Sequence, residues 1–208
     1  MWVSCLDMEG VLVPEIWVNV AEHTGIDALR LTTRDIADYD ELMAHRMQVL
    51  YEHGLKMSDI QRVIAKMRPY EGAVEFLHWL RERGEVLVLS DTFIQFARPL
   101  IEQLGNPTIL CHSLVVKDDR IVDYQVRLAD QKRAALRAFQ GLNFQTVAVG
   151  DSYNDLAMLR AADIGALFRP PANVVTEHPE LPVTYDYAKL ETLIQSRMDE
   201  LQDAAPVL

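Results

Sequence analysis

The sequence is poor in cysteine, in basic residues and in long apolar runs, and each shortage narrows what the protein can be. Two cysteines are present, Cys5 and Cys111, and both lie in apolar, strand-like segments. We therefore expect a small buried thiol at each position, rather than a disulfide or a metal ligand. The six histidines show none of the paired spacing that favours a zinc site.

Positive charge is also scarce, since 20 Lys and Arg stand against 31 Asp and Glu, for a formal net charge of -11. Such a protein repels nucleic acid and anionic membrane surfaces, so neither is expected as a partner. No apolar run approaches the roughly 18 residues that cross a membrane. Asp7 and Glu9, without a basic stretch before them, argue against a secretory signal. We expect a cytoplasmic protein.

What the sequence does contain is a series of apolar, strand-like runs separated by helical patterns. This alternation predicts an α/β fold: a Rossmann-like, mostly parallel sheet with helices on both faces. Residues 114–127, with Asp118 and Asp119 at the turn, predict an antiparallel hairpin added to it. The strand-like runs are residues 3–6, 85–90, 107–110, 145–150 and 164–168.

The connection between the first two strands is unusually long. A crossover can be made in about a dozen residues, whereas residues 8–84 separate Asp7 from the second strand. The intervening sequence shows helical patterns at residues 15–24, 38–53 and 58–67.

These patterns predict a helical cap inserted after the first strand. Residues 69–83 are expected to be the crossover helix, so the core domain comprises residues 1–14 and 69–208, and the cap comprises residues 15–68. A cap that leaves from the carboxyl end of the first strand lies over that end. Ligands of open α/β sheets bind there.

Four polar motifs follow the predicted strands or begin the next helix. Each has a simple structural explanation, such as a turn, a helix cap or a solvated lysine. Their convergence on one edge of one sheet favours a shared site instead. The motifs are Asp7-Met8-Glu9-Gly10-Val11, Leu89-Ser90-Asp91-Thr92, Lys132 and Gly150-Asp151-Ser152-Tyr153-Asn154-Asp155.

Four of these residues, Asp7, Glu9, Asp151 and Asp155, would bring several negative charges into one crevice. Each pair repels by roughly 4 kcal/mol at about 4 Å and an effective dielectric of about 20. A divalent cation with oxygen ligands is the natural partner, and Mg²⁺ is favoured because a phosphate can complete its coordination. Lys132 would offset a further charge.

The order and strand-end positions of these motifs resemble those of the haloacid dehalogenase-like phosphatases. Within that superfamily the chain is most similar to the phosphoserine phosphatases, and above all to a bacterial subgroup that also transfers phosphate from phosphoserine to homoserine. The resemblance covers nearly the whole chain. It implies a small-molecule substrate and a Mg²⁺-dependent reaction through an aspartyl-phosphate intermediate, and it leaves a homodimer open.

The resemblance also implies roles at the reacting centre. Asp7 would attack phosphorus, and Glu9 would protonate the departing serine oxygen and then deprotonate the acceptor. Mg²⁺ would be held by Asp7, the backbone carbonyl of Glu9 and Asp151. Asp155 would ligate in support or from the outer shell, and Gly10 would let the chain bend toward the cap.

Four further residues would hold the phosphate by the same resemblance. Ser90 and the backbone amide of Asp91 would bind its oxygens where a helix begins. Lys132 would hold a phosphoryl oxygen, and Asn154 would reach the phosphate or the substrate.

One position departs from the usual family pattern, which has Asp two residues after the nucleophile where this chain has Glu9. The extra methylene changes where the acid lies and leaves open whether water or an alcohol is the better acceptor. The homoserine-transferring subgroup carries the same Glu.

The cap would bind the part of the substrate other than the phosphate. In phosphoserine phosphatases an early Glu binds the ammonium group and an Arg on a later cap helix binds the carboxylate, and Glu15 and Arg46 match them. The alternative for Glu15, less favoured by its position after the strand end, is to stabilise a helix N-terminus. Arg46 shares a face with an apolar stripe, where a guanidinium needs a partner. That partner is a substrate carboxylate, unless Arg46 snorkels or forms a salt bridge within the cap.

Three other functions remain open at this point. One is a receiver-like signalling domain, which the long insertion disfavours because a switch needs an accessible aspartate. Another is a dehalogenase, which Glu9, Asp151 and Asp155 disfavour because such enzymes need no metal. The third is a phosphatase for another small phosphomonoester, and Glu15 and Arg46 are the residues that oppose it.

Overall fold

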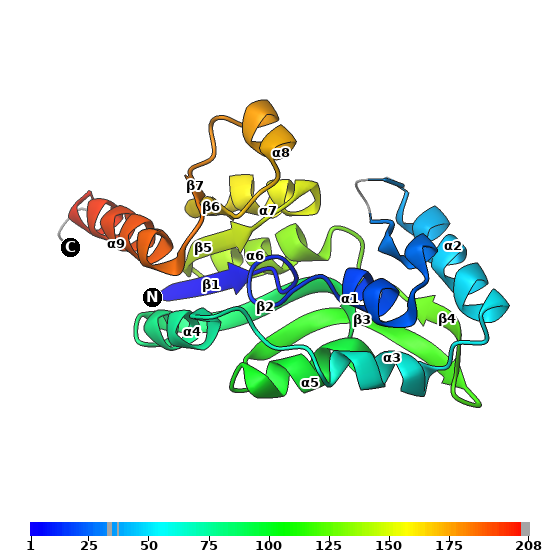
Figure 1. The fold of residues 1–208 in the computed structure, drawn as a ribbon. Helices are drawn as coiled ribbons and strands as arrows, with labels where there is room; N and C mark the ends of the chain where they lie inside the picture. The colour runs from blue at the N-terminus through cyan, green and yellow to red at the C-terminus, as the bar shows by residue number, and fades with distance from the viewer. Residues whose placement is uncertain (33–34, 37, 205–208) are drawn as a thin grey trace.

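The structure is a computed structural model that describes residues 1–32, 35–36 and 38–204. Within these residues the centre is a seven-stranded sheet in the order β4-β3-β2-β1-β5-β6-β7 (Figure 1). All neighbouring strands are parallel except β3 and β4. The strands are β1 (Trp2–Leu6), β2 (Gly84–Phe93), β3 (Thr108–Lys117), β4 (Arg120–Gln125), β5 (Gln145–Gly150), β6 (Ile164–Phe168) and β7 (Val183–Thr184).

The central strand β1 is buried along its whole length, between β2 and β5. Its side chains alternate between two cores: Trp2 and Leu6 join one hydrophobic cluster, and Val3 and Cys5 join another. A strand covered on both faces needs a nearly continuous apolar run, which is the pattern the sequence shows.

Helices cover both faces of the sheet, as predicted. Phe76 and Phe96 place α4 and α5 in the first cluster, whereas Leu136 and Leu159 place α6 and α7 in the second. Figure 1 shows these two pairs of helices on opposite sides of β1. The helices are α4 (Ala73–Arg81), α5 (Ile94–Gln103), α6 (Gln131–Gly141), η2 (Tyr153–Asp155), α7 (Leu156–Ala161), α8 (Ala172–Glu177) and α9 (Tyr187–Asp203).

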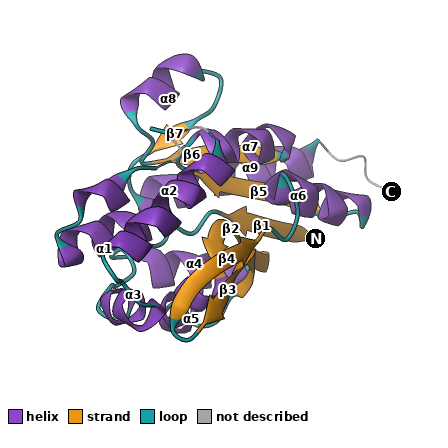
Figure 2. Ribbon diagram, turned by 90° about the vertical axis from the view of Figure 1, so that its right-hand side faces the viewer, coloured by secondary structure: helices purple, strands orange, loops and turns teal. Residues whose placement is uncertain are grey.

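The long first connection is helical, as predicted. It contains α1 (Ile16–Thr24), η1 (Asp27–Arg30), α2 (Tyr39–Glu52) and α3 (Met57–Ile64). In two views at right angles, α1 and α2 lie at the opposite end of the molecule from both chain termini, beyond the carboxyl end of β1 (Figures 1 and 2). The exact division into a core and a cap stays a prediction.

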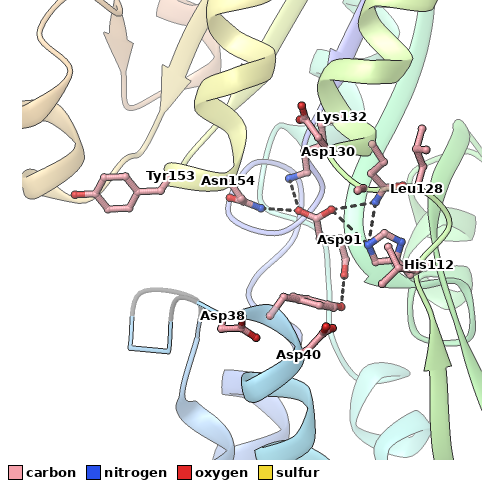
Figure 3. A pocket seen from close by; sticks show the side chains of 13 residues that line it. Asp38, Asp40, Asp91, His112, Leu128, Asp130, Lys132, Tyr153 and Asn154 are labelled. Carbon is pink, nitrogen blue, oxygen red and sulfur yellow. Dashed lines mark hydrogen bonds and ion pairs between the residues drawn. The ribbon is translucent and has the colours of Figure 1, made fainter.

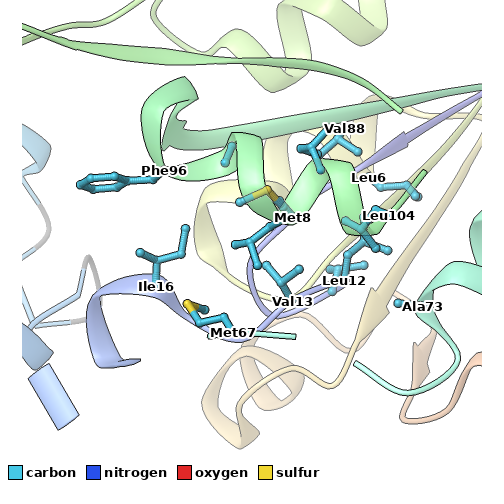
Figure 4. Packing of buried hydrophobic residues seen from close by; sticks show 14 of the residues in the cluster. Leu6, Met8, Leu12, Val13, Ile16, Met67, Ala73, Val88, Phe96 and Leu104 are labelled. Carbon is cyan, nitrogen blue, oxygen red and sulfur yellow. The ribbon is translucent and has the colours of Figure 1, made fainter. Parts of the chain in front are cut away.

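The segment between β1 and α1 is packed rather than exposed. Met8, Val13 and Ile16 are buried in the first cluster, near α5 (Figure 4). Backbone amides of Leu12 and Val13 both donate to the carbonyl of Met8, at 2.8 and 3.0 Å, which closes a tight loop. This loop holds the two predicted catalytic carboxylates against the core.

The hairpin of β3 and β4 turns at Asp118 and Asp119, as predicted, and both residues have a positive φ. Its tip also holds the cap, because the Asp119 carboxylate accepts hydrogen bonds from the amide and hydroxyl of Ser58, at 2.9 and 2.6 Å. The first turn of α3 is therefore tied to the sheet.

Two further expectations concern composition. Cys5 and Cys111 are buried free thiols, as predicted. Among the described residues, no helix has both the length and the apolar character that crossing a membrane requires.

Candidate active site

Three predicted carboxylates meet at the carboxyl ends of β1 and β5. Asp7 follows β1 directly, and its amide donates to the carbonyl of Val149 at 2.9 Å. Asp151 and Asp155 follow β5, and one oxygen from each of the three carboxylates lies within 4.8 Å of the others. All three side chains are buried. Segments 144 residues apart in the sequence thus build one acidic cluster, whose metal-binding role the structure leaves as a prediction.

Lys132 is the ammonium group inside this cluster. Its Nζ lies 2.9 Å from Oδ1 of Asp7, 2.7 Å from Oδ1 of Asp155 and 3.7 Å from Oδ2 of Asp91. Burial opposes its charge, but Asp155 and Asp7 outweigh that effect and raise the pKa of Lys132 well above its ordinary value. Lys132 and Leu136, four residues apart on α6, are both buried.

The cluster retains an excess of negative charge despite Lys132. Burial raises the pKa of Asp7 well above its ordinary value; Asp155 and Asp151 add to this effect, and Lys132 opposes it. Charge crowding of this kind favours a bound cation. Three carboxylates with only oxygen donors suit a hard divalent ion.

Asp155 has little capacity left for a direct metal bond. Its Oδ1 faces Lys132, and its Oδ2 accepts the amides of Asp151 and Ser152 at 3.0 and 3.1 Å. It fixes the loop that carries Asp151, which fits an outer-shell role better than a direct one.

Two glycines allow this close packing. A Cβ on Gly10, where φ is 80°, would lie 2.5 Å from Cγ of Asp151. A Cβ on Gly150 would lie 2.3 Å from Cγ of Asp155. Gly10 therefore provides the special backbone conformation that was predicted, and in addition makes room for a site carboxylate.

The carboxylate of Glu9 is not part of the acidic cluster, so any metal contact from this residue would come from its backbone carbonyl. Its Oε2 accepts the amide of Ile16, the first residue of α1, at 2.7 Å. Burial raises the pKa of Glu9, whereas hydrogen bonds from Ile16 and Thr92 and the charge of Arg46 oppose the rise. Glu9 thus lies between the sheet and the cap.

Core and cap residues line one small cavity of about 90 Å³. Eight of the ten predicted site residues reach it. The other two, Lys132 and Asp155, lie behind Asp7 and contact it or each other. The lining residues are Asp7, Glu9, Glu15, Trp17, Thr32, Tyr39, Leu42, Arg46, Ser90, Asp91, Thr92, Phe93, Asp151, Ser152 and Asn154.

Arg46 enters this cavity from α2 and is 7% exposed. Its guanidinium carbon lies 4.7 Å from the ring centroid of Trp17, and its Nη2 donates to the carbonyl of Leu31 at 3.0 Å. Its Nε has no hydrogen-bond partner among the described residues. Burial lowers the pKa of Arg46 to about 10, with Glu9 among the groups that oppose this change. Such an unsatisfied buried donor suits an anionic ligand.

The prediction that Ser90 and Asp91 stand where a helix begins is wrong. Strand β2 continues to Phe93, and α5 begins at Ile94. The polar residues therefore occupy the end of a strand, where an irregularity in the pairing with β3 falls between Leu89 and Phe93. Any phosphate contact by Ser90 or the Asp91 amide would come from strand-end backbone, without a helix terminus.

Asp91 contributes a carboxylate that sequence reasoning used only as a backbone amide. It accepts hydrogen bonds from Nε2 of Gln131 at 3.0 Å and Nδ2 of Asn154 at 2.9 Å (Figure 3). Burial alone would raise the pKa of Asp91, but the charge of Lys132 and these hydrogen bonds outweigh it and lower the pKa. Asn154 is thereby oriented by a core side chain.

Three residues beside Asp91 were missed by sequence reasoning. Buried Gln131 also donates to the carbonyl of Ser90 at 2.7 Å. Its position next to Lys132 in the sequence could have marked it as a site residue. His112 lies 3.6 Å from Asp91, and the Tyr39 hydroxyl donates to the Asp91 carbonyl at 3.1 Å. No local pattern marks His112 or Tyr39, because each joins the site through a contact distant in sequence.

A wider hollow of about 930 Å³ adjoins the small cavity, and Tyr39, Asp91 and Asn154 line both. Figure 3 shows Asp91 at its centre, between Asn154 and His112. The two spaces thus meet beside the Asp91 network.

Known proteins are similar to this chain in sequence. A family model described as haloacid dehalogenase-like hydrolase matches residues 12–160. The phosphoserine phosphatase ThrH of Pseudomonas aeruginosa is 56% identical over 192 residues, which cover 92% of this chain and 94% of that protein. A phosphoserine phosphatase of Pseudomonas syringae pv. tomato is 55% identical over 190 residues, which cover 91% of this chain and 80% of that protein.

A solved structure agrees in fold. A substrate-bound phosphoserine phosphatase complex superposes with a TM-score of 0.76 at 21% identity, covering 90% of this chain and 95% of that chain. At this identity the likeness supports the α/β architecture alone. From the family match and the two close relatives, the chain belongs to the haloacid dehalogenase-like hydrolases.

Proposed function

We propose that the protein is a Mg²⁺-dependent phosphoserine phosphatase of the cytoplasm, which releases serine and phosphate through an aspartyl-phosphate intermediate. One observation carries the proposal: Asp7, Glu15 and Arg46 line the same small cavity. The nucleophile Asp7 matches the phosphate of phosphoserine, the negative Glu15 matches its ammonium group, and the positive Arg46 matches its carboxylate. The names of the two close relatives support the same substrate.

The donor set fits Mg²⁺. Asp7, Asp151 and the backbone carbonyl of Glu9 would hold the ion, with Asp155 supporting them through the loop of Asp151. When bound, the ion supplies positive charge against the acidic cluster and the phosphate oxygens.

The protein's own groups then divide the reaction into two displacements. In the first, an oxygen of Asp7 bonds to phosphorus as the bond from phosphorus to the serine oxygen breaks, and Glu9 gives that oxygen its proton. In the second, Glu9 takes a proton from water as the water oxygen bonds to phosphorus and the bond between phosphorus and the Asp7 oxygen breaks. Lys132, 2.9 Å from Asp7, fixes the orientation of the nucleophile.

The cap selects the amino-acid part of the substrate. Arg46 presents an unsatisfied Nε–H beside the cavity, and a carboxylate would complete its hydrogen bonding in the forked geometry that guanidinium groups favour. Glu15 would meet the ammonium group. A cavity of about 90 Å³ favours a small phosphomonoester over a phosphorylated protein segment.

A second activity, transfer to homoserine, is favoured by Glu9. This residue replaces the more usual Asp and contacts the cap through Ile16, so its reach toward an acceptor differs from that of the shorter acid. Homoserine carries the same ammonium and carboxylate groups as serine, which would let it occupy the site after serine leaves.

Incubation with phosphoserine and Mg²⁺, with and without homoserine, tests both activities. We expect inorganic phosphate in both mixtures and phosphohomoserine in the second, measured by ³¹P NMR. Phosphate without phosphohomoserine would reject the transfer and keep the phosphatase. Release of neither product would reject both.

A further inference from the structure

Glu9 lies between the start of α1 and the end of β2. On the cap side, its Oε2 accepts the backbone amide of Ile16 at 2.7 Å. On the core side, Thr92, near the end of β2, lines the same small cavity as Glu9. Ile16 is fully buried, and Thr92 is 6% exposed. Neither residue belongs to the acidic cluster around Asp7.

The backbone between Glu9 and Ile16 explains the first contact. The amide of Gly10 donates to the carbonyl of Val13 at 2.8 Å, so the chain turns back on itself and enters α1 next to Glu9. The first amides of a helix have no partner within the helix. A carboxylate is favoured at this end by the helix dipole as well. Glu9 therefore fills a position that the start of α1 leaves open.

We propose that the Ile16 amide and the Thr92 hydroxyl are positioning groups that aim Glu9 at the oxygen leaving phosphorus. The proposal rests on the phosphatase function proposed above. A proton passes only when donor and acceptor lie about 2.6 to 3.2 Å apart. A Glu side chain has three rotatable bonds, so hydrogen bonds to both groups would restrict it to one arrangement. The cap helix α1 thereby sets the geometry of proton transfer in the core.

This role predicts a dependence on the leaving group. The oxygen of serine is a poor leaving group, so it needs the proton of Glu9 as its bond to phosphorus breaks. Nitrophenolate is stable as an anion and leaves without that proton. Loss of a positioning group should therefore slow phosphoserine far more than p-nitrophenyl phosphate, whereas a general disturbance of the site slows both.

Two pairs of variants test the contacts. Ile16→Pro removes the amide hydrogen, and proline is tolerated at the first position of a helix. Glu15, with ψ 120°, already lies outside the helical region that a following proline disfavours. Ile16→Ala is its control, because it loses buried volume and keeps the amide. Thr92→Val removes the hydroxyl with little change of shape, and Thr92→Ser restores it.

The quantity measured is the ratio of kcat for phosphoserine to kcat for p-nitrophenyl phosphate. We expect Ile16→Pro and Thr92→Val to lower this ratio about 10-fold or more, within the range that general acid catalysis supplies. Ile16→Ala and Thr92→Ser should keep the ratio of the unmodified enzyme. Equal loss with both substrates, or equal ratios within each pair, would overturn the proposal.

The same ratio with 2-phosphoglycerol in place of phosphoserine separates the two proposals. If the unmodified enzyme accepts this alkyl phosphate and not phosphoserine, the proposed substrate is wrong. The positioning proposal is then tested by the ratio of kcat for 2-phosphoglycerol to kcat for p-nitrophenyl phosphate, with the same expected changes. If Ile16→Pro fails to fold, the Thr92 pair decides the question alone.

Discussion

At the scale of single residues, Arg46 shows how a costly placement points to a ligand. Its position on an apolar stripe is visible in the sequence, and Leu42, Met43, Val49 and Leu50 are indeed buried around it. The stacking on Trp17 and the unsatisfied Nε are not visible there, because they depend on how the cap helices pack. The sequence could therefore mark the residue but not its geometry.

Arg46→Ala should raise KM for phosphoserine about 10- to 100-fold, the usual loss for hydrogen bonds to a charged group. It should change KM for p-nitrophenyl phosphate little, because that substrate has no carboxylate for the guanidinium. Steady-state kinetics with both substrates measures the difference. An equal rise for both would contradict the proposed contact with a carboxylate.

Asp91 makes a prediction about acid stability. Its pKa is lowered in the folded protein, since the charge of Lys132 and the hydrogen bonds outweigh burial. A lowered pKa stabilises the fold above the unfolded value of about 3.9, and this stabilisation is lost as the pH falls through the folded pKa.

Asp91→Asn should therefore unfold at lower urea concentration than the unmodified protein at pH 7 and at pH 5, by a similar margin at each. The margin should shrink below about pH 4, where Asp91 takes up a proton. Urea titrations across this range measure it. A margin that grows as the pH falls would show that the carboxylate is not stabilising when ionised.

At the scale of structural elements, the loop after β1 combines two demands. It must turn toward the cap, and it must let Asp151 approach within the space beside Gly10. The positive φ of Gly10 meets the first demand, and its missing side chain meets the second. Gly10 therefore tolerates little change.

Gly10→Ala should lower the free energy of unfolding by about 1 to 3 kcal/mol and reduce activity, because the new methyl group meets Asp151. Gly54→Ala is the matched control, since Gly54 has a positive φ of 63° and nothing within 4 Å of a new Cβ. Thermal unfolding and phosphate release measure both effects. If Gly54→Ala is equally harmful to activity, the contact with Asp151 is not the cause.

Elements were predictable where a local pattern decides them. The strands from β1 to β6 and the helices of the first connection follow from apolar periodicity, which a buried strand or an amphipathic helix requires. Strand β7 has two residues, Val183 and Thr184, too few to form a pattern. The extension of β2 from Asp91 to Phe93 was missed, because Ser, Asp and Thr are good helix caps as well as strand-end residues.

At the scale of the whole molecule, the core and the cap share one hydrophobic cluster. Val20 and Leu50 of the cap join Val88 of the sheet and Leu190 of α9 in it. The Asp119 contact with Ser58 links the same two parts through polar groups. The site is assembled by contacts such as that of Lys132 with Asp7, 125 positions apart. Sequence reasoning could place these residues at one sheet edge, but not pair them, because their partners are set by the folded chain.

The central claim is that Asp7, within the buried acidic cluster, forms the bond to phosphorus. The most direct test is the rate of phosphate release from phosphoserine by Asp7→Asn, with Mg²⁺ present and folding verified by circular dichroism. The account predicts a loss of at least about 1,000-fold, the scale expected when a nucleophile is removed. A variant that keeps a tenth or more of the activity would contradict it.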